Sequence, residues 1–164
     1  MPSRLAADIK QKKRFTSLEQ EAFLLLQRTT SDLAKIGDQV FKTAGLSGPQ
    51  YNILRILRGA GAKGLACGEI SDRLITRDPD ITRLLDRMET RGLVSRRRDK
   101  ADRRVIIARI TRAGLDLLAR LDTPINAAHR EQLGHLTKRQ LQTLIEILDA
   151  ARKRNTTTIN RKKS

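Results

Sequence analysis

The stretch Gly92–Gly114 reads GLVSRRRDKADRRVIIARITRAG and decides the fold that we expect. Two apolar runs, LVS and VIIARI, flank the segment RRRDKADRR, which holds six basic residues and two acidic ones. The second run alternates with a period of two, which is typical of a strand with one face buried, and the first run predicts its antiparallel partner. So many like charges repel one another unless an anion lies nearby. We therefore expect a β-hairpin with a cationic tip that meets a polyanion.

Two helices are predicted before this hairpin, joined by the tight segment ITRDP. A brief strand at Leu65 and Ala66 precedes the first helix, and the second begins at Asp78, an N-cap followed by proline at the first helical position. Its apolar residues recur at helical spacing and face the core, which leaves the opposite face to solvent. The core-facing set is Ile81, Leu84, Leu85 and Met88, and the solvent-facing set is Asp80, Thr82, Arg83, Asp86 and Arg87. A helix-turn-helix followed by a basic hairpin is the layout of a winged helix.

Further helices are predicted on both sides of this domain. A helical pattern begins at Leu18, and from Ala22 to Val40 it follows heptad spacing, which fits either a core helix of the same chain or a helix that packs against a partner. Capping-box pairs mark two helix starts, Ser47 with Gln50 and Thr137 with Gln140, and Thr111 caps a third helix that Pro124 should bend or interrupt. Residues 1–16 and 153–164 are predicted to be a basic flexible arm and a basic flexible tail.

Composition limits the partners of the chain. Its 164 residues, 38% of them apolar, suffice for one domain with a core, and a net charge of +16 attracts nucleic acid or an anionic membrane. Aromatic residues make up only 2% of the chain. Proteins that bind single-stranded DNA or RNA usually stack bases on aromatic side chains, so this composition argues against both ligands. No apolar run has the length of a membrane span, and no apolar segment follows the basic N-terminal residues. Duplex DNA in the cytoplasm is therefore the expected partner and location.

Enzymatic and metal chemistry find no support in the sequence. No nucleophile with a base, carboxylate pair or phosphate-binding glycine loop emerges, so we expect neither an enzyme nor a cofactor. His129 and His135 lie six residues apart, off one helical face, and lack companion ligands for a metal. The single cysteine, Cys67, excludes an internal disulfide; a quiet thiol is the preferred interpretation over a redox sensor, which requires a resolving partner or exposure.

The segment DPDITRLLDRMETRGLVSRRRDKADRRVIIARITRAG resembles the centre of the MarR family of bacterial transcription regulators. The family pattern runs roughly T-x-L-x-x-x-L-x-x-x-G-L-V-x-R, then D-R-R, then L-T-x-x-G. The matching positions are Thr82, Leu84, Met88, Gly92, Leu93, Val94, Arg96, Asp102, Arg103, Arg104, Ile110, Thr111 and Gly114. The resemblance covers residues 46–114 and departs from the pattern at Ile110, usually leucine, and at Ala66, often a capping Thr or Ser. It implies a fold that is mostly α with a small β-hairpin wing, the winged helix-turn-helix domain being flanked by dimerisation helices.

The resemblance also implies homodimers in which the first and last helices of each subunit intertwine. Residues 17–45 and 115–152 then become dimerisation segments, and a small molecule, often phenolic, bound near the winged domain is the usual effector. Asp102 would orient an arginine at the wing tip. The candidate dimer-interface residues are Leu26, Leu33, Leu141, Leu144 and Leu148.

A two-fold dimer should place two recognition helices in successive major grooves of a pseudo-palindromic operator. The expected DNA contacts of the helix are Arg77, Asp80, Thr82, Arg83 and Arg87, and those of the wing are Arg98, Lys100, Asp102, Arg103 and Arg104. Alternatively, Arg83 and Arg87 only bridge to Asp86 or to phosphates, and Arg96, Arg97 and Arg98 form a solvated strand. We thus expect a sequence-specific regulator, usually a repressor, or alternatively an architectural DNA-binding protein with weak sequence preference.

Overall fold

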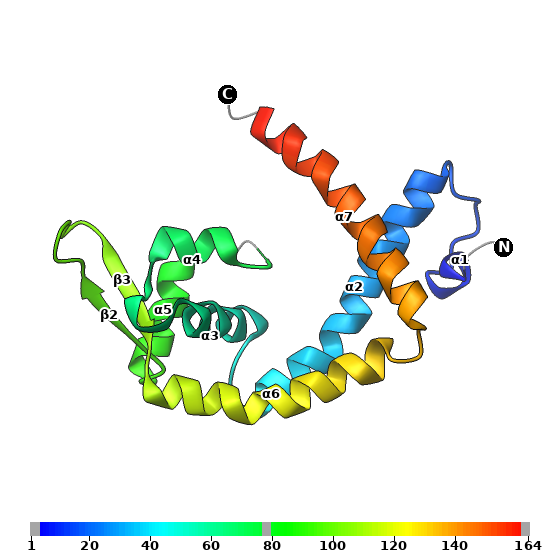
Figure 1. The fold of residues 1–164 in the computed structure, drawn as a ribbon. Helices are drawn as coiled ribbons and strands as arrows, with labels where there is room; N and C mark the ends of the chain where they lie inside the picture. Colours follow the sequence, from blue (N-terminus) through cyan, green and yellow to red (C-terminus); the bar gives the residue numbers. More distant parts are fainter. Residues whose placement is uncertain (1–3, 77–79, 162–164) are drawn as a thin grey trace. The chain divides into compact units, whose positions relative to one another are not determined.

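The computed structural model describes residues 4–76 and 80–161, with side chains up to Lys153. Figure 1 shows its elements, which are α1 (Leu5–Asp8), α2 (Leu18–Thr43), α3 (Gly48–Ala60), the 3-10 helix η1 (Gly61–Lys63), β1 (Leu65–Ala66), α4 (Cys67–Arg73), α5 (Ile81–Thr90), β2 (Val94–Arg98), β3 (Ile106–Ile110), α6 (Arg112–Leu133) and α7 (Lys138–Arg161). The predicted class, mostly α with a small β-hairpin wing, is confirmed. The chain forms two compact units, Met1–Ile125 and Asn126–Ser164.

The sheet of the first unit is antiparallel, with β3 between β1 and β2. Arg96 on β2 and Leu65 on β1 both lie opposite Ala108, so the brief first strand completes the predicted hairpin as a third strand. Gly64 leads into β1 with a φ of 69°, and a Cβ at this position would come within 2.3 Å of the Ala108 carbonyl oxygen. Glycine is therefore required where the chain approaches β3 so closely.

The core of the first unit lies among the helices and the inner face of the sheet. Leu85 and Met88 on α5 are fully buried, and Ile81 and Leu84 pack against the core, as the helical spacing predicts. Other fully buried side chains come from α3, α4, β2 and α6, and include Ile53, Leu54, Leu57, Ile70, Val94 and Leu118. This packing fixes which face of α5 remains outward.

An ion pair holds α6 against α3. The guanidinium of Arg58 donates to both carboxylate oxygens of Asp122, at 2.8 and 3.1 Å. These hydrogen bonds lower the pKa of Asp122 from its ordinary value. Of the predicted bend or interruption at Pro124, the interruption does not occur, because α6 continues through the proline. Leu121 and Ile125, on either side of the proline, are both buried.

The predicted capping boxes form at α3 and α7. The Ser47 amide donates to Oε1 of Gln50 at 3.0 Å and the Gln50 amide donates to the Ser47 hydroxyl at 3.4 Å. Thr137 and Gln140 make the same two bonds at 2.9 and 3.3 Å. At the start of α6, the Thr111 hydroxyl accepts from the Gly114 amide at 3.1 Å.

The predicted start of α5 is wrong by two residues. The N-cap is Asp80, whose carboxylate accepts from the Arg83 amide at 3.2 Å, and the helix begins at Ile81. Asp80 is the acidic residue directly before the first apolar residue of the helix, so its cap and the packing of Ile81 act together. The predicted cap Asp78 lies outside the described residues, as does Pro79.

Both ends of the chain carry more helix than the sequence suggested. Residues 1–16, predicted to be a flexible arm, contain α1, and its Leu5 is only 1% exposed. Burial of this apolar side chain gives the segment a structure that a basic composition alone does not predict. At the other end, α7 continues past residue 153, where the tail was predicted to begin, as far as Arg161, and it contains no glycine or proline that would end it. None of the helices within the described ranges is long and apolar enough to cross a membrane.

Candidate nucleic-acid interface

The outward face of α5 presents hydrogen-bond donors to solvent. Thr82, Arg83 and Arg87 are all exposed, on the side of the helix opposite Leu85 and Met88. The side chain of Arg83 is 70% exposed, and its guanidinium lies 3.8 Å from the carboxylate of Asp80, not beside Asp86. This long contact leaves most of the guanidinium donors of Arg83 available to a ligand.

The alternative prediction that Arg96 lies on a solvated strand is wrong, because its side chain is paired and largely buried. Its Nε and Nη2 donate to Oε2 of Glu89 at 2.9 and 2.7 Å, its backbone amide donates to Oε1 at 2.8 Å, and Nη2 also binds Asp86. The side chain is only 18% exposed. The hydrogen bond from Arg96 is the main cause that lowers the pKa of Glu89. Arg96 therefore fastens the wing to α5, the predicted recognition helix.

This tie was missed, although the sequence contains a signal for it. Glu89 lies near the end of the predicted helix and Arg96 lies near the start of the predicted strand, on either side of Gly92. Gly92 has a φ of 69° and turns the chain back, so the two side chains meet. A glycine turn between an acidic and a basic residue, here Gly92 between Glu89 and Arg96, is thus the sequence feature that could have predicted the pair.

Two carboxylates shape the tip of the wing. Asp99 accepts from the amides of Ala101 and Asp102 at 2.8 and 3.0 Å, and these backbone bonds lower the pKa of Asp99. Asp102 accepts from the amide of Arg104 at 2.9 Å, so it orients this arginine through its backbone. Both acids accept from amides inside the loop, and although Asp102 stays exposed, basic side chains outnumber acidic ones at the tip.

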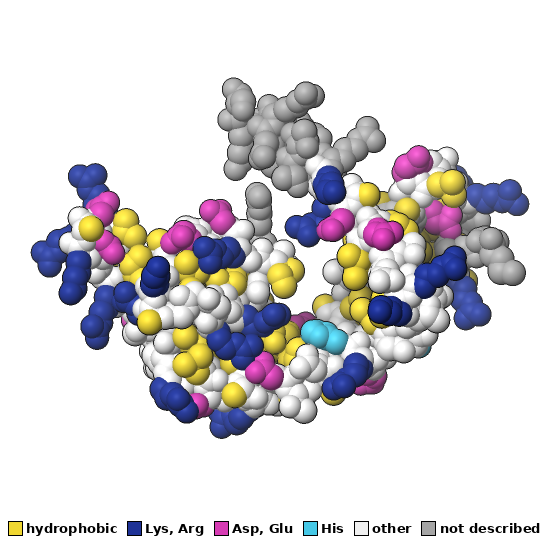
Figure 2. All heavy atoms as spheres, viewed as in Figure 1, with side chains coloured by type: hydrophobic (Ala, Val, Ile, Leu, Met, Phe, Trp, Pro, Cys, Tyr) yellow, Lys and Arg dark blue, Asp and Glu magenta, His cyan; other side chains and the backbone are white. Residues whose placement is uncertain are grey.

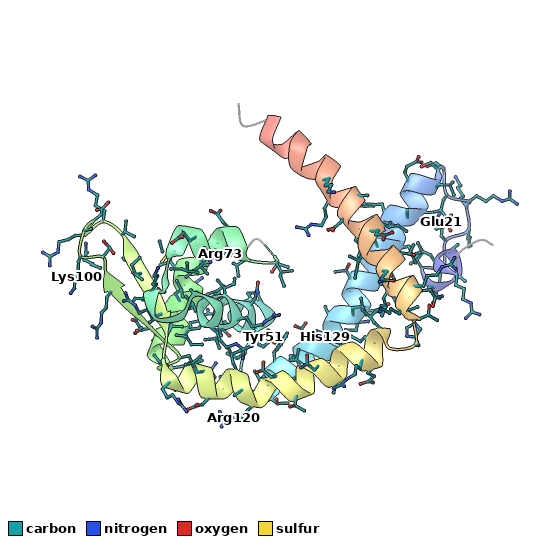
Figure 3. All side chains as sticks on the ribbon, in the orientation of Figure 1. Glu21, Tyr51, Arg73, Lys100, Arg120 and His129 are labelled. Atoms are coloured by element: carbon teal, nitrogen blue, oxygen red, sulfur yellow. The ribbon has the colours of Figure 1, made fainter. Side chains whose placement is uncertain are left out.

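The cationic side chains project from this tip. Lys100, Arg103 and Arg104 are exposed, and Figure 3 shows Lys100 at the end of the hairpin. Arg98 is exposed too, and donates to the Arg103 carbonyl at 2.9 Å. Dark blue side chains accordingly gather over the wing in Figure 2. A surface of this kind attracts phosphate groups through charge and supplies donors for them.

The outer face of the sheet adds a basic hollow of about 520 Å³. Arg97 of β2 and Arg109 of β3 lie on this face, and Nε of Arg109 donates to the Ala62 carbonyl at 2.9 Å. The hollow is lined by Ser95, Arg97, Arg98, Asp99, Lys100, Ile107 and Arg109. It extends the positive surface of the tip along the strands.

Arg91, the C-cap of α5, adds a second anchor at the same C-terminal end of the helix. Its guanidinium donates to the carbonyl oxygens of Ala44, at 3.0 Å, and Gly45, just after the end of α2. The partners lie 46 and 47 residues apart in sequence, so no local pattern could have predicted this contact. The helix α5 is therefore tied to the wing by Arg96 and to the residues after α2 by Arg91.

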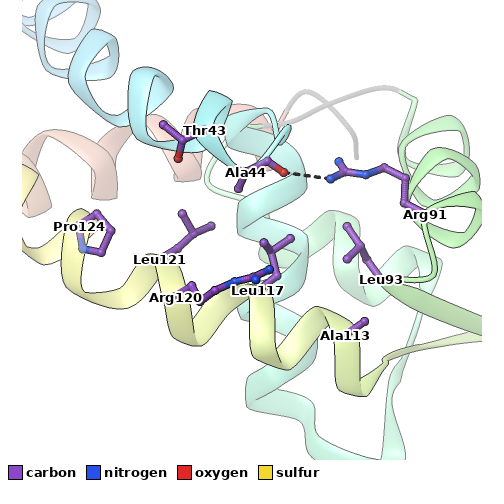
Figure 4. Close-up of a pocket in the computed structure, with 9 residues that line it drawn as sticks. All are labelled: Thr43, Ala44, Arg91, Leu93, Ala113, Leu117, Arg120, Leu121 and Pro124. Atoms are coloured by element: carbon purple, nitrogen blue, oxygen red, sulfur yellow. Dashed lines mark hydrogen bonds between the residues drawn. The ribbon is translucent and has the colours of Figure 1, made fainter.

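A cavity of about 540 Å³ opens beside Arg91 (Figure 4). The residues that line it are Thr43, Ala44, Arg91, Leu93, Ala113, Leu117, Arg120, Leu121 and Pro124. The walls are mostly apolar, with two guanidinium groups among them. Cavities of this size and mixed lining suit small organic ligands.

The described residues place no group of three or more His, Cys, Asp and Glu side chains where they could hold a metal ion. Cys67 is half-buried, with Sγ 3.9 Å from the carbonyl oxygen of Ile106. The predicted DNA contact Arg77 lies outside the described residues.

Comparison with known proteins agrees with this geometry. Residues 46–106 match the model of the MarR family. The homoprotocatechuate degradative operon repressor of Escherichia coli is 30% identical over 110 residues, which cover 67% of this chain and 73% of the relative. A MarR transcription factor from Planctomyces limnophilus, solved by crystallography, is 44% identical with a TM-score of 0.65, covering 84% of this chain and 99% of that one.

The crystal structure of a mutant MarR from Escherichia coli in complex with operator DNA has the same fold, with a TM-score of 0.73 at 20% identity, over 83% of this chain and 99% of that one. The matched family region holds both the helix-turn-helix and most of the wing. The chain therefore belongs to the MarR family of winged helix-turn-helix, DNA-binding transcription regulators.

Proposed function

We propose that this regulator binds a pseudo-palindromic duplex site as a homodimer, represses transcription there, and is released by a small molecule. The observation that carries the proposal is the donor-rich outer face of α5, which Arg96 holds at a fixed position beside the cationic wing. A rigid reading surface favours sequence-specific binding, because little order has to be gained on association. The protein would act in the cytoplasm, at the nucleoid.

Base reading is assigned to the middle of α5. Arg83 and Arg87 pair with guanines in the major groove and Thr82 contacts a neighbouring base, while Asp80 orders the start of the helix through its cap. Arg77, which precedes the helix, contacts a phosphate. The exposed position of Arg83 supports this role, since only a projecting guanidinium reaches the acceptors on a base edge.

Wing contacts come from Lys100, Arg103 and Arg104, with Arg98 at the base of the tip. An arginine inserted into a narrow minor groove gains from its enhanced negative potential. Asp102 fixes the direction of the chain at Arg104, and Arg98 fixes the carbonyl of Arg103. The wing thus strengthens binding at every sequence, and α5 selects among sequences.

The dimer would bury helix faces that a single chain leaves uncovered. No residue of α2, all of which the structure describes, is buried, and Phe23 is 59% exposed. On α7, Ile145 is 61% exposed. We assign the partner-facing surface to the candidates Leu26, Leu33, Leu141, Leu144 and Leu148. Two recognition helices would then lie about 34 Å apart, one helical turn of DNA.

The effector would occupy the cavity beside Arg91. A compact apolar molecule with an anionic group fits its lining, and the phenolic ligands of the family are of this kind. An anion that engages Arg91 would compete with the carbonyls of Ala44 and Gly45 and would loosen α5 from α2. Release of DNA follows, because the recognition helix then loses its fixed position.

The experiment is a selection of genomic fragments with the purified protein, followed by competition against random duplex at fixed salt. A specificity ratio of roughly a thousand or more supports the regulator. A ratio near one would overturn it in favour of an architectural DNA-binding protein, which the net charge of +16 favours as the second candidate. The repressor of Escherichia coli supports the sign of regulation, which a reporter assay with the selected fragments tests.

A further inference from the structure

The positive charge of the chain is concentrated outside α5, the helix proposed to read DNA. The helix α5 holds two basic and two acidic residues and is neutral. Residues 92–111, which form the wing, hold seven basic and two acidic residues, and residues 1–17 hold five basic and one acidic residue. The N-terminal segment is therefore a second cationic region of almost the same strength as the wing.

This segment has a defined structure. The Gln11 amide donates to the Ala6 carbonyl at 2.8 Å, after Lys10 has turned the chain with a φ of 54°. The Gln11 side chain donates to the Lys13 carbonyl at 2.9 Å, and the Thr16 amide donates to Gln20 of α2 at 2.7 Å. Hydrogen bonds at both ends thus hold the loop between α1 and α2, and ordered cations lose less entropy on binding than a frayed arm does.

Four cations project from this loop, which we call the N-terminal basic loop and define as Lys10, Lys12, Lys13 and Arg14. All four side chains are exposed. None of them forms an ion pair with any residue in the described part of the chain. Their mutual repulsion is relieved only when an anionic partner approaches.

The loop lies at the opposite end of α2 from the winged domain, as Figure 1 shows within the first unit. The helix has 26 residues, so its length is about 39 Å at 1.5 Å per residue. Figure 2 shows dark blue side chains over this end as well as over the wing. The two cationic surfaces are therefore far enough apart to hold different stretches of polyanion.

We infer that the N-terminal basic loop binds the phosphate backbone of a second segment of duplex DNA, without sequence preference, while α5 and the wing hold the operator. This inference rests on the proposed function and adds a bridging activity to it. Phosphates suit lysine and arginine side chains, whose binding releases condensed counterions. Phe15, which directly follows the loop in sequence, is half-buried and so offers little platform for stacking single-stranded bases.

The test compares the full chain with the variant Lys10→Gln, Lys12→Gln, Lys13→Gln, Arg14→Gln. A biotinylated random duplex is held on beads with the protein, and capture of a fluorescent operator duplex in solution measures bridging. We expect the variant to lose bridging at least tenfold while its affinity for one isolated operator duplex changes less than threefold. The salt dependence of bridging should also weaken, by up to about 0.9 in log–log slope for each lost phosphate contact.

A matched control removes the same charge elsewhere, through Lys42→Gln, Arg130→Gln, Lys138→Gln and Arg139→Gln, all at exposed positions. This control should bridge as the unaltered chain does. The inference is overturned if the unaltered chain does not bridge, if the loop variant bridges equally well, or if the control loses bridging to the same extent. Failure of the proposed function looks different, because the unaltered chain would then show no preference for the isolated operator duplex over a random one.

Discussion

The guanidinium of Arg96 on β2 and the carboxylate of Glu89 on α5 are joined by two side-chain hydrogen bonds, at 2.7 and 2.9 Å. The Arg96 amide adds a third bond to the same carboxylate. The helix proposed to read bases and the wing proposed to contact the backbone therefore share one connection. Their spacing is fixed before DNA binds, which favours one register of the protein on the duplex.

Loss of this pair should weaken both folding and DNA binding. We expect Arg96→Gln to lower the free energy of unfolding by about 1–2 kcal/mol, because charge-assisted hydrogen bonds are strong but Glu89 is partly exposed. Operator affinity should fall as well, although Arg96 need not touch DNA. Urea unfolding and fluorescence anisotropy measure the two effects, and a double-mutant cycle with Glu89→Gln should give a coupling energy of similar size.

The neighbouring Arg97 provides the control. It is exposed on the outer face of the sheet, so Arg97→Gln should leave the free energy of unfolding nearly unchanged. Equal destabilisation by Arg96→Gln and Arg97→Gln would contradict the special role of the pair.

Acid should remove the contribution of Glu89. Its pKa is lowered in the folded protein, mainly by the hydrogen bond from Arg96. The folded state therefore binds the proton less well than the unfolded state, so the stabilisation is present above the ordinary value of 4.5 and is lost as pH falls through the lowered pKa. We expect the difference in unfolding free energy between the natural chain and Glu89→Gln to shrink as pH falls below 4.5. A constant difference across this range would contradict the assignment, and Asp72→Asn, at an exposed carboxylate, serves as the control.

Substitutions in α5 and in the wing should differ in their effect on sequence specificity. Arg104→Ala should weaken binding to all duplexes and reduce the log–log salt slope by about 0.9. Arg83→Ala should cost about 1–3 kcal/mol on the selected site and also relax preference at one base position. Titrations over several salt concentrations, with single-base variants of the site, measure both. Unchanged affinity and salt slope for Arg104→Ala, or identical losses on specific and random DNA for Arg83→Ala, would refute these roles.

The cavity beside Arg91 should control release from DNA. Arg120 lines the cavity and is exposed, so Arg120→Gln should leave operator affinity close to that of the natural chain. A phenolic carboxylic acid that releases the natural protein should need at least a roughly tenfold higher concentration to release this variant. Anisotropy of a labelled operator during ligand titration gives both values. Arg130→Gln, farther along α6, should respond as the natural chain does; an unaltered response of Arg120→Gln would rule out this cavity.

Assembly should depend on the apolar face of α2. Leu26→Glu places a charge on the proposed partner surface, where burial without a counter-charge is unfavourable. We expect this variant to sediment as a monomer at micromolar concentration and to lose operator affinity by at least an order of magnitude. Lys35→Glu, on an exposed position of the same helix, should remain dimeric. A Leu26→Glu protein that stays dimeric would show that α2 does not form the interface as proposed.

Much of the winged domain is predictable from the sequence because its signals are local. The helical spacing of Leu85 and Met88 fixes the buried face of α5, and the capping pair of Ser47 and Gln50 fixes the start of α3. These features depend on residues a few positions apart. Local patterns therefore suffice for the class of fold and for the outward face of the recognition helix.

Other features depend on tertiary contacts. Asp78 and Asp80 both make plausible caps, and packing of Ile81 against the core accompanies the choice of Asp80. The contact of Arg91 with Ala44 joins residues 47 positions apart, and the burial of Leu5 cannot be derived from a basic N-terminal composition. The bonds that hold the site at a fixed position were consequently harder to predict than the residues proposed to touch DNA.

Competition binding tests the central claim most directly. The purified protein is titrated onto a duplex selected from genomic fragments while unlabelled random duplex competes, and sedimentation of the complex gives the number of chains bound. We predict two chains on each selected duplex and a preference of roughly a thousandfold or more over random DNA. Equal affinity for both duplexes, or a single chain on the selected one, would contradict the account.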